Sequence, residues 1–124
     1  MALLLDTHIL AWFAAGDIRL KPHALDAILN PDTPLFVSAV VAWEYVELEL
    51  RGRFHGAAPL GALLERLGAA TLDYPAELWT LAAALPPIHR DPVDRMLVAH
   101  ALALDMPLVT ADADIRRYPI PTVW

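Results

Sequence analysis

Cysteine is absent from the 124 residues of this chain. Its absence excludes disulfide bonds, a thiolate nucleophile and a cysteine-based zinc site. A chain without disulfides fits a reducing compartment, and we expect a cytoplasmic protein. Long apolar runs are missing too, because Asp6 and His8 interrupt the apolar N-terminal stretch and no basic residue precedes it. We therefore expect neither a signal peptide nor a membrane-spanning helix.

Positive charge is scarce. The formal net charge is −6, and Lys21 is the only lysine. Nucleic-acid binding needs cations against phosphates, so this balance argues against it unless a bound divalent metal or a local arginine cluster supplies them. Close arginine pairs do occur, at Arg51/Arg53, Arg90/Arg95 and Arg116/Arg117. No stretch alternates aromatic and basic residues as an RNA-stacking platform would.

What the chain does have is apolar residues, which make up 57% of it. That fraction excludes a disordered protein, and the length suits one domain, residues 1–124, with a real core. The excess of apolar residues also makes a dimer face or a partner surface plausible.

Short apolar segments alternate with helical ones. Strands are predicted at 2–5, 34–38, 70–73 and 107–110, with a fifth in the tail 119–124. Helices are predicted at 7–15, 22–30, 38–51, 59–68, 75–85 and 91–105, with a short one within 111–118. The alternation predicts the α/β class, with a parallel sheet covered on both faces. In such folds, functional residues gather beyond the carboxyl ends of the strands.

Two aspartates occupy such positions. Asp6 directly follows the first predicted strand, and Asp112 follows the fourth. Each also precedes a helix, so helix capping is an equally available explanation. The same ambiguity holds for Asp91 and Asp94 in HRDPVDRMLVAH, where they resemble a capping box. Asp94, however, also falls on the apolar stripe of its helix.

Glu44 is harder to explain as a cap, because it lies well inside a predicted helix. Its neighbours at helical spacing are Val40, Val41 and Leu48, which places its carboxylate on the apolar face. A buried, unpaired carboxylate is costly, so Glu44 needs a partner. A buried ion pair with an arginine is one solution, and a metal ion is another.

The four acids considered together favour the metal. If Asp6, Glu44, Asp94 and Asp112 converge, their repulsion must be offset by a cation. Oxygen ligands without cysteine select Mg²⁺ or Mn²⁺. Such an ion can activate water and stabilise charge developing on a phosphoryl group. The pattern thus points towards phosphodiester hydrolysis.

Four segments carry a resemblance to a known family. LLLDTHILAW, SAVVAWE, HRDPVDRMLVAHAL and LVTAD occur in this order over nearly the whole chain. The chain resembles PIN-domain ribonucleases, specifically the VapC-type toxins of bacterial and archaeal toxin–antitoxin pairs. The resemblance implies a single PIN-like, three-layer α/β/α domain around a short parallel sheet. It further implies a Mg²⁺- or Mn²⁺-dependent endoribonuclease that acts on RNA, forms a homodimer and is silenced by a VapB-type antitoxin.

The resemblance also implies residue roles. The family's four acids match Asp6, Glu44, Asp94 and Asp112. Asp6 and Asp94 are expected to bind the metal directly, and the other two directly or through water. Supporting polar residues match Thr7 and Thr110, with Asp91 in a capping or outer role.

Roles for arginine and histidine remain open from the sequence. Arg90 and Arg95 could grip flanking RNA phosphates, and Arg95 could instead pair with a site carboxylate. His8 and His89 flank the proposed site in sequence. A packed or surface role is expected for His8, and none is assigned to His89. His100 stands where many relatives carry Gln or Thr.

Three other functions are alternatives to a ribonuclease. A catalytically silent PIN-like module that binds RNA or protein remains the main alternative. A phosphatase of the haloacid-dehalogenase type would need a second aspartate two residues after the first, where this chain has His8. A receiver-like signalling domain would need paired acids before its phosphoacceptor and a lysine after a late strand, and the chain has only Lys21.

Overall fold

The computed structural model describes residues 1–54 and 58–124. Its strands form one sheet in the order β3-β2-β1-β4-β5, and every pairing is parallel. The strands are β1 Leu3–Leu5, β2 Leu35–Ser38, β3 Ala70–Leu72, β4 Leu108–Val109 and β5 Thr122–Val123. The five short strands and their parallel arrangement were predicted from the sequence, and the structure confirms them.

Helices occupy most of the chain between the strands. They are α1 Thr7–Ala15, α2 Pro22–Leu29, α3 Ala39–Leu50, α4 Leu60–Leu67, α5 Leu78–Ala84, α6 Pro92–Leu104 and the 3₁₀ turn η1 Ile115–Arg117. Two helices are much shorter than predicted. The expected helix at 75–85 begins only at Leu78, because a turn in which the Leu78 N–H donates to the Pro75 carbonyl precedes it. The expected helix within 111–118 is the single turn η1.

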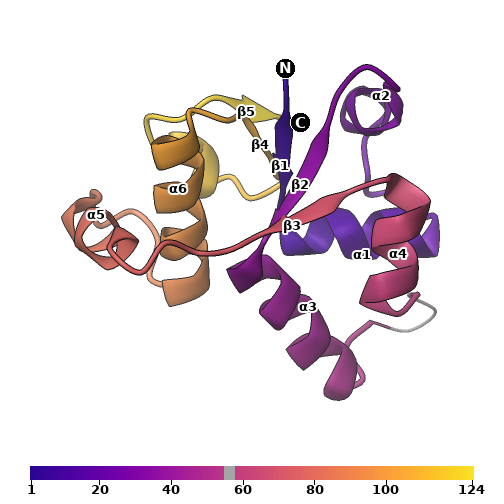
Figure 1. Ribbon diagram of the computed structural model, residues 1–124, viewed down its shortest axis with the longest axis horizontal. Coiled ribbons are helices and arrows are strands. Elements are labelled where there is room, and N and C mark those ends of the chain that lie inside the picture. The colour runs from indigo at the N-terminus through magenta and orange to yellow at the C-terminus, as the bar shows by residue number, and fades with distance from the viewer. Residues whose placement is uncertain (55–57) are drawn as a thin grey trace.

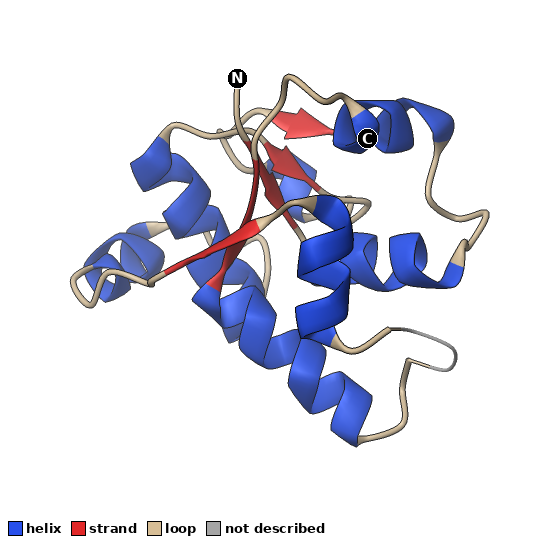
Figure 2. Cartoon of the chain, turned by 45° about the vertical axis from the view of Figure 1, so that its right-hand side comes forward, coloured by secondary structure: helices blue, strands red, loops and turns tan. Residues whose placement is uncertain are grey.

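Helices cover both faces of the sheet (Figure 1). Helices α5 and α6 lie on one side of it, whereas α1, α2 and α4 lie on the other (Figures 1 and 2). The central strand β1 is therefore buried on both faces, and Leu4 and Leu5 have no exposed surface. Burying each such side chain contributes roughly 1.5–3 kcal/mol, so β1 anchors the core.

The sheet topology decides where polar side chains meet. Strand β1 lies between β2 and β4, with Leu5 in register with Val109. The residues that follow these strands, Asp6 and Thr110, therefore emerge side by side at the carboxyl edge. This edge is where ligands of open α/β sheets bind. Within residues 1–54 and 58–124, no helix is long and apolar enough to cross a bilayer.

Candidate active site

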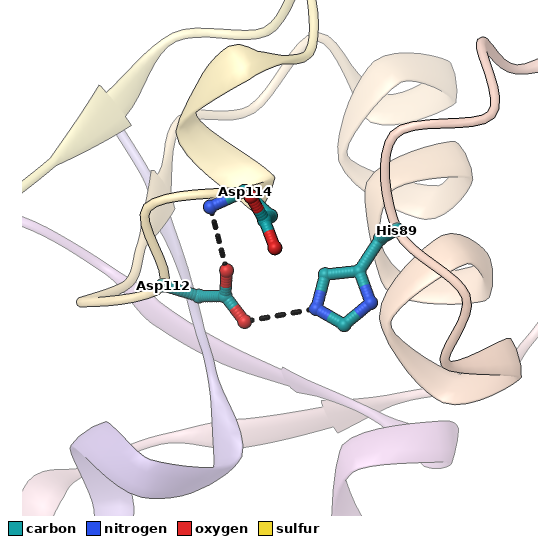
Figure 3. A group of neighbouring side chains, drawn as sticks. All are labelled: His89, Asp112 and Asp114. Carbon is teal, nitrogen blue, oxygen red and sulfur yellow. Dashed lines mark hydrogen bonds and ion pairs between the residues drawn. The ribbon is translucent and has the colours of Figure 1, made fainter.

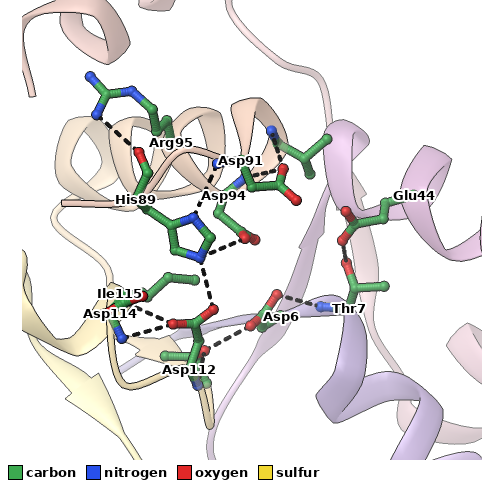
Figure 4. Close-up of polar contacts among 12 residues, drawn as sticks. Asp6, Thr7, Glu44, His89, Asp91, Asp94, Arg95, Asp112, Asp114 and Ile115 are labelled. Carbon is green, nitrogen blue, oxygen red and sulfur yellow. Dashed lines mark hydrogen bonds and ion pairs between the residues drawn. The ribbon is translucent and has the colours of Figure 1, made fainter. Parts of the chain in front are cut away.

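Three carboxylates from distant parts of the chain meet at this edge (Figure 4). Asp6 follows β1, Glu44 lies in α3 and Asp94 lies in α6. One oxygen from each lies within 4.8 Å of the other two. Together with Asp112 they line a cleft of about 250 Å³. All four sequence-predicted acids therefore face one cavity.

Asp6 is fixed by both of its oxygens. Oδ1 accepts the Thr7 N–H at 2.7 Å, so Asp6 caps α1. Oδ2 accepts the Thr110 hydroxyl, also at 2.7 Å. The capping explanation is therefore correct for this residue, and its second oxygen is held at the cleft by Thr110. The side chain is buried, and little freedom remains for it to turn away.

Glu44 receives the Thr7 hydroxyl on Oε1. Thr7 thus links two of the three carboxylates, since its backbone N–H already binds Asp6. The alternative of a buried Glu–Arg pair is not observed: no arginine in the described residues forms an ion pair with Glu44.

Asp94 points into the cleft because of how α6 begins. Asp91 caps the helix, its Oδ1 accepting the Val93 N–H at 2.9 Å and the Asp94 N–H at 3.4 Å. Pro92 follows in the first turn, where its fixed φ suits a helix start. This start sets the phase of α6, and Asp94 leaves only 15% of its side chain exposed. The expected capping role of Asp91 is confirmed.

The three carboxylates of the trio repel one another, and the neighbouring side chains do not supply enough positive charge to balance them. Burial, followed by the charge of Asp6, raises the pKa of Asp94 to about 7. Burial also raises the pKa of Asp6, and burial with the charge of Asp6 raises that of Glu44. Carboxylates held close together away from water favour a bound cation. Three oxygen donors and no sulfur match Mg²⁺ or Mn²⁺.

His89 joins the site, which the sequence did not predict. Its Nδ1 accepts the Asp91 N–H at 3.1 Å, so Nε2 carries the proton. Nε2 lies 3.0 Å from Oδ2 of Asp94 and 3.0 Å from Oδ2 of Asp112 (Figure 4). Burial alone would lower the pKa of His89, but the two neighbouring carboxylates outweigh it and raise that pKa. Nothing in HRDP indicates a contact with Asp112, which follows 23 residues later.

Asp112 lies beside the trio rather than within it (Figure 4), next to His89 and Asp114 (Figure 3). Its Oδ1 accepts the N–H groups of Asp114 at 2.8 Å and Ile115 at 3.1 Å, which caps η1. Its Oδ2 faces His89. Burial opposes ionisation of Asp112, but the His89 and backbone hydrogen bonds prevail and lower its pKa. Asp112 is therefore a stable carboxylate that orients His89.

The carboxylate pairing that the sequence left open for Arg95 is not observed among the described residues. Its guanidinium turns away from the carboxylates and donates to the carbonyls of Ala82 at 2.7 Å, Pro86 at 3.0 Å and Leu85 at 3.1 Å. These carbonyls lie at the end of α5 and just beyond it, where few helical N–H donors are left, and the planar guanidinium supplies several N–H donors at once. Arg90, in contrast, is exposed at the rim next to Asp91.

His8 and His100 form no hydrogen bond with the carboxylate trio in the described part of the chain, although His8 lines the same cleft. His8 is exposed on α1, with its ring 6.1 Å from that of Trp12. His100 is buried in α6, and its Nδ1 lies 2.9 Å from the Ser38 hydroxyl. Ser38 also caps α3 through that oxygen, so His100 acts in the core by fixing the start of a helix.

The sequence of this chain matches a known protein family. The PIN domain model matches residues 3–121. The chain belongs to the PIN-domain family. A curated relative, Ribonuclease VapC22 of Mycobacterium tuberculosis, is 35% identical over 127 residues, covering 98% of this chain and 97% of that protein.

Solved structures share the PIN fold. VapBC2 from Rickettsia felis, solved bound to a DNA fragment from its promoter, superposes with a TM-score of 0.72 at 19% identity and covers 98% of this chain and 97% of its own. VapC20 of Mycobacterium tuberculosis, described as a sarcin–ricin loop cleaving toxin, gives a TM-score of 0.67 at 21% identity and 92% coverage of both chains. The three-layer α/β arrangement expected from the sequence is thus the PIN fold.

Proposed function

We propose that this PIN domain, residues 1–124, is a divalent-metal-dependent endoribonuclease that hydrolyses RNA phosphodiester bonds. The observation that carries the proposal is the carboxylate trio of Asp6, Glu44 and Asp94, whose oxygens lie within 4.8 Å of one another. The ribonuclease name of the relative VapC22 supports RNA as the substrate.

The trio would hold Mg²⁺ or Mn²⁺, with Asp6 and Asp94 as direct ligands and Glu44 bound directly or through water. Asp112 would act through His89 or through water. The ion supplies positive charge that activates a water molecule and stabilises the charge developing on phosphate oxygens. The protein needs no nucleophile of its own for such a hydrolysis.

The remaining site residues would act on these carboxylates. Thr110 and Thr7 hold the two oxygens of Asp6 in place, and Thr7 also holds Glu44. This restraint keeps the ligands in the binding geometry before the ion arrives, which lowers the cost of ordering them. Arg90, exposed at the rim, would contact a flanking phosphate.

The resemblance to VapC-type toxins supports a biological role as the toxin of a toxin–antitoxin module in the cytoplasm. A VapB-type antitoxin would then be the partner, and a homodimer the assembly. Two exposed tryptophans fit an unpartnered surface of this kind: Trp43 is 61% exposed and Trp79 is 70% exposed.

A catalytically silent PIN module that binds RNA or protein is the second candidate. It is favoured by one observation: Asp6, Asp91 and Asp112 all cap helices, so each has a structural reason to be present.

Cleavage assays separate the two candidates. Wild type, Asp6→Asn and Asp94→Asn are incubated with transfer and ribosomal RNA in Mg²⁺, Mn²⁺ or EDTA. Asparagine also caps helices, so Asp6→Asn should fold. The exposed Asp26→Asn on α2 is the matched control. The nuclease predicts metal-dependent cleavage that both site variants lose and the control keeps. Absence of cleavage by antitoxin-free protein would favour the silent module.

A growth experiment tests the toxin role separately. Expression of the protein should arrest growth, and co-expression of the partner gene product should relieve the arrest.

A further inference from the structure

A second groove adjoins the catalytic cleft. Its volume is about 360 Å³, and its walls include His8, Trp12, Arg19, Arg53 and Phe54. His8 and Trp12 also line the catalytic cleft. The two cavities therefore share one wall on α1. An extended ligand that follows this wall from the carboxylate trio would enter the groove.

The groove is basic in a protein whose net charge is −6. Asp17 is the acid that lines it, and Arg19 offsets that charge with hydrogen bonds of 2.7–3.1 Å to the carboxylate. Arg53 is exposed and forms no ion pair within the described residues. Arg51, two residues earlier, is instead paired with Glu47. Arg53 is thus the cation of this groove that an anionic ligand could use.

Flat side chains line the same groove. The Arg19 guanidinium lies 5.0 Å from the Trp12 ring centroid, and the rings of His8 and Phe54 lie 6.2 Å apart. The sequence shows no aromatic–basic alternation because these residues come from two segments, α1 with its following turn and the turn that follows α3. The fold brings them together into the combination that single-stranded nucleic-acid sites use, a cation for the backbone and flat groups for bases.

We propose that this groove binds the single-stranded RNA segment next to the scissile phosphate. Arg53 contacts a backbone phosphate, and the exposed His8 ring or the outer face of Arg19 stacks against a base. The proposal rests on the proposed function, and it adds that the substrate is unpaired on this side of the cut. It also places a side-chain cation next to the acidic site, where it attracts a polyanionic chain.

A matched pair of variants tests this. Arg53→Gln and Arg51→Gln remove the same charge two residues apart, but only Arg53 lines the groove. Each is made in Asp94→Asn protein, so that binding is measured without cleavage. The probe is a fluorescein-labelled oligouridylate of about 12 nucleotides. Fluorescence anisotropy gives its dissociation constant at several salt concentrations, and thermal unfolding checks that both variants fold.

If the groove binds RNA, only Arg53→Gln should weaken binding. The slope of log K against log salt concentration should then become shallower by about 0.7, the value for one lost phosphate contact on a single strand. In the cleaving protein, Arg53→Gln should raise KM about fivefold and leave kcat unchanged, since the contact is made equally before and during reaction.

Two outcomes would overturn the proposal. Equal effects of the two variants would mean that only overall charge matters. An Arg53→Gln effect confined to inhibition by a protein partner would assign the groove to that partner. A wild-type protein that binds the probe through Arg53 but cleaves no RNA supports the groove and refutes the nuclease, so the two proposals fail separately.

Discussion

His89 Nε2 lies 3.0 Å from Asp94 Oδ2. This contact connects the loop before α6 to the carboxylate trio, and it fixes the one carboxylate whose pKa rises to about 7. The loop itself is held in turn, because the His89 N–H donates to the Tyr118 hydroxyl at 2.8 Å. The orientation of Asp94 thus depends on His89 and Tyr118, which lie outside the carboxylate trio.

Replacing His89 with glutamine should therefore impair catalysis through Asp94. We expect kcat to fall about 10- to 100-fold, as for other residues that orient metal ligands, and the affinity for Mn²⁺ to fall as well. Steady-state kinetics and a calorimetric Mn²⁺ titration measure the two effects. His23→Gln, an exposed change on α2, is the control. Unchanged Mn²⁺ affinity would show that His89 does not position the ligands.

Stability of the metal-free protein should fall as pH rises from about 4 to about 7. The pKa of Asp94 is about 7 in the folded protein against an ordinary 3.8, so the unfolded chain ionises first over this window. The raised pKa values of Asp6 and Glu44 act in the same direction. The lowered pKa of Asp112 acts oppositely below its ordinary value of 3.8, and the lowered pKa of buried His100 does so just below its ordinary value of 6.5. Denaturant unfolding in EDTA across this pH range measures the effect, and a rise of stability with pH would contradict it.

Asp94→Asn should stabilise the metal-free protein near neutral pH, although it removes a ligand. The substitution deletes a charge that burial and Asp6 both penalise. We expect a higher Tm than wild type in EDTA and a smaller gain on adding saturating Mg²⁺. Differential scanning calorimetry with and without the ion distinguishes this from a general loss of stability, which would lower Tm in both conditions.

Arg95→Lys should destabilise the fold and leave RNA affinity unchanged. A lysine cannot reproduce the fork that serves the Ala82 and Leu85 carbonyls. Losing these hydrogen bonds should lower the free energy of unfolding by about 1–3 kcal/mol, measured by urea unfolding. Arg90→Lys, at an exposed position, is the control and should leave stability unchanged. If Arg95 gripped phosphate instead, its substitution would raise KM without lowering the free energy of unfolding.

The sequence predicted the sheet and the position of the acids because both depend on local signals. An apolar run such as Leu3–Leu5 followed by Asp6 indicates a strand end, and parallel strands bring their carboxyl ends to one edge. Glu44 was recognisable because a charge within an apolar helix face needs a partner. The boundaries of α5 were less predictable, because the turn at Pro75–Leu78 rests on a hydrogen bond that competes with the helix.

Contacts across long sequence distances could not be predicted. His89 reaches Asp112 and Arg95 reaches Ala82 only after α5 and α6 have packed together. Their residue types were compatible with several roles, and geometry decided between them. The groove at Arg53 and Trp12 is a further case, since its walls come from α1 and from the segment that follows α3.

The most direct test of the metal site is a calorimetric Mn²⁺ titration of wild type, Asp94→Asn and the exposed Asp26→Asn near neutral pH. The account predicts that Asp94→Asn weakens Mn²⁺ binding at least about tenfold while Asp26→Asn binds like wild type. Identical isotherms for the three proteins would contradict it.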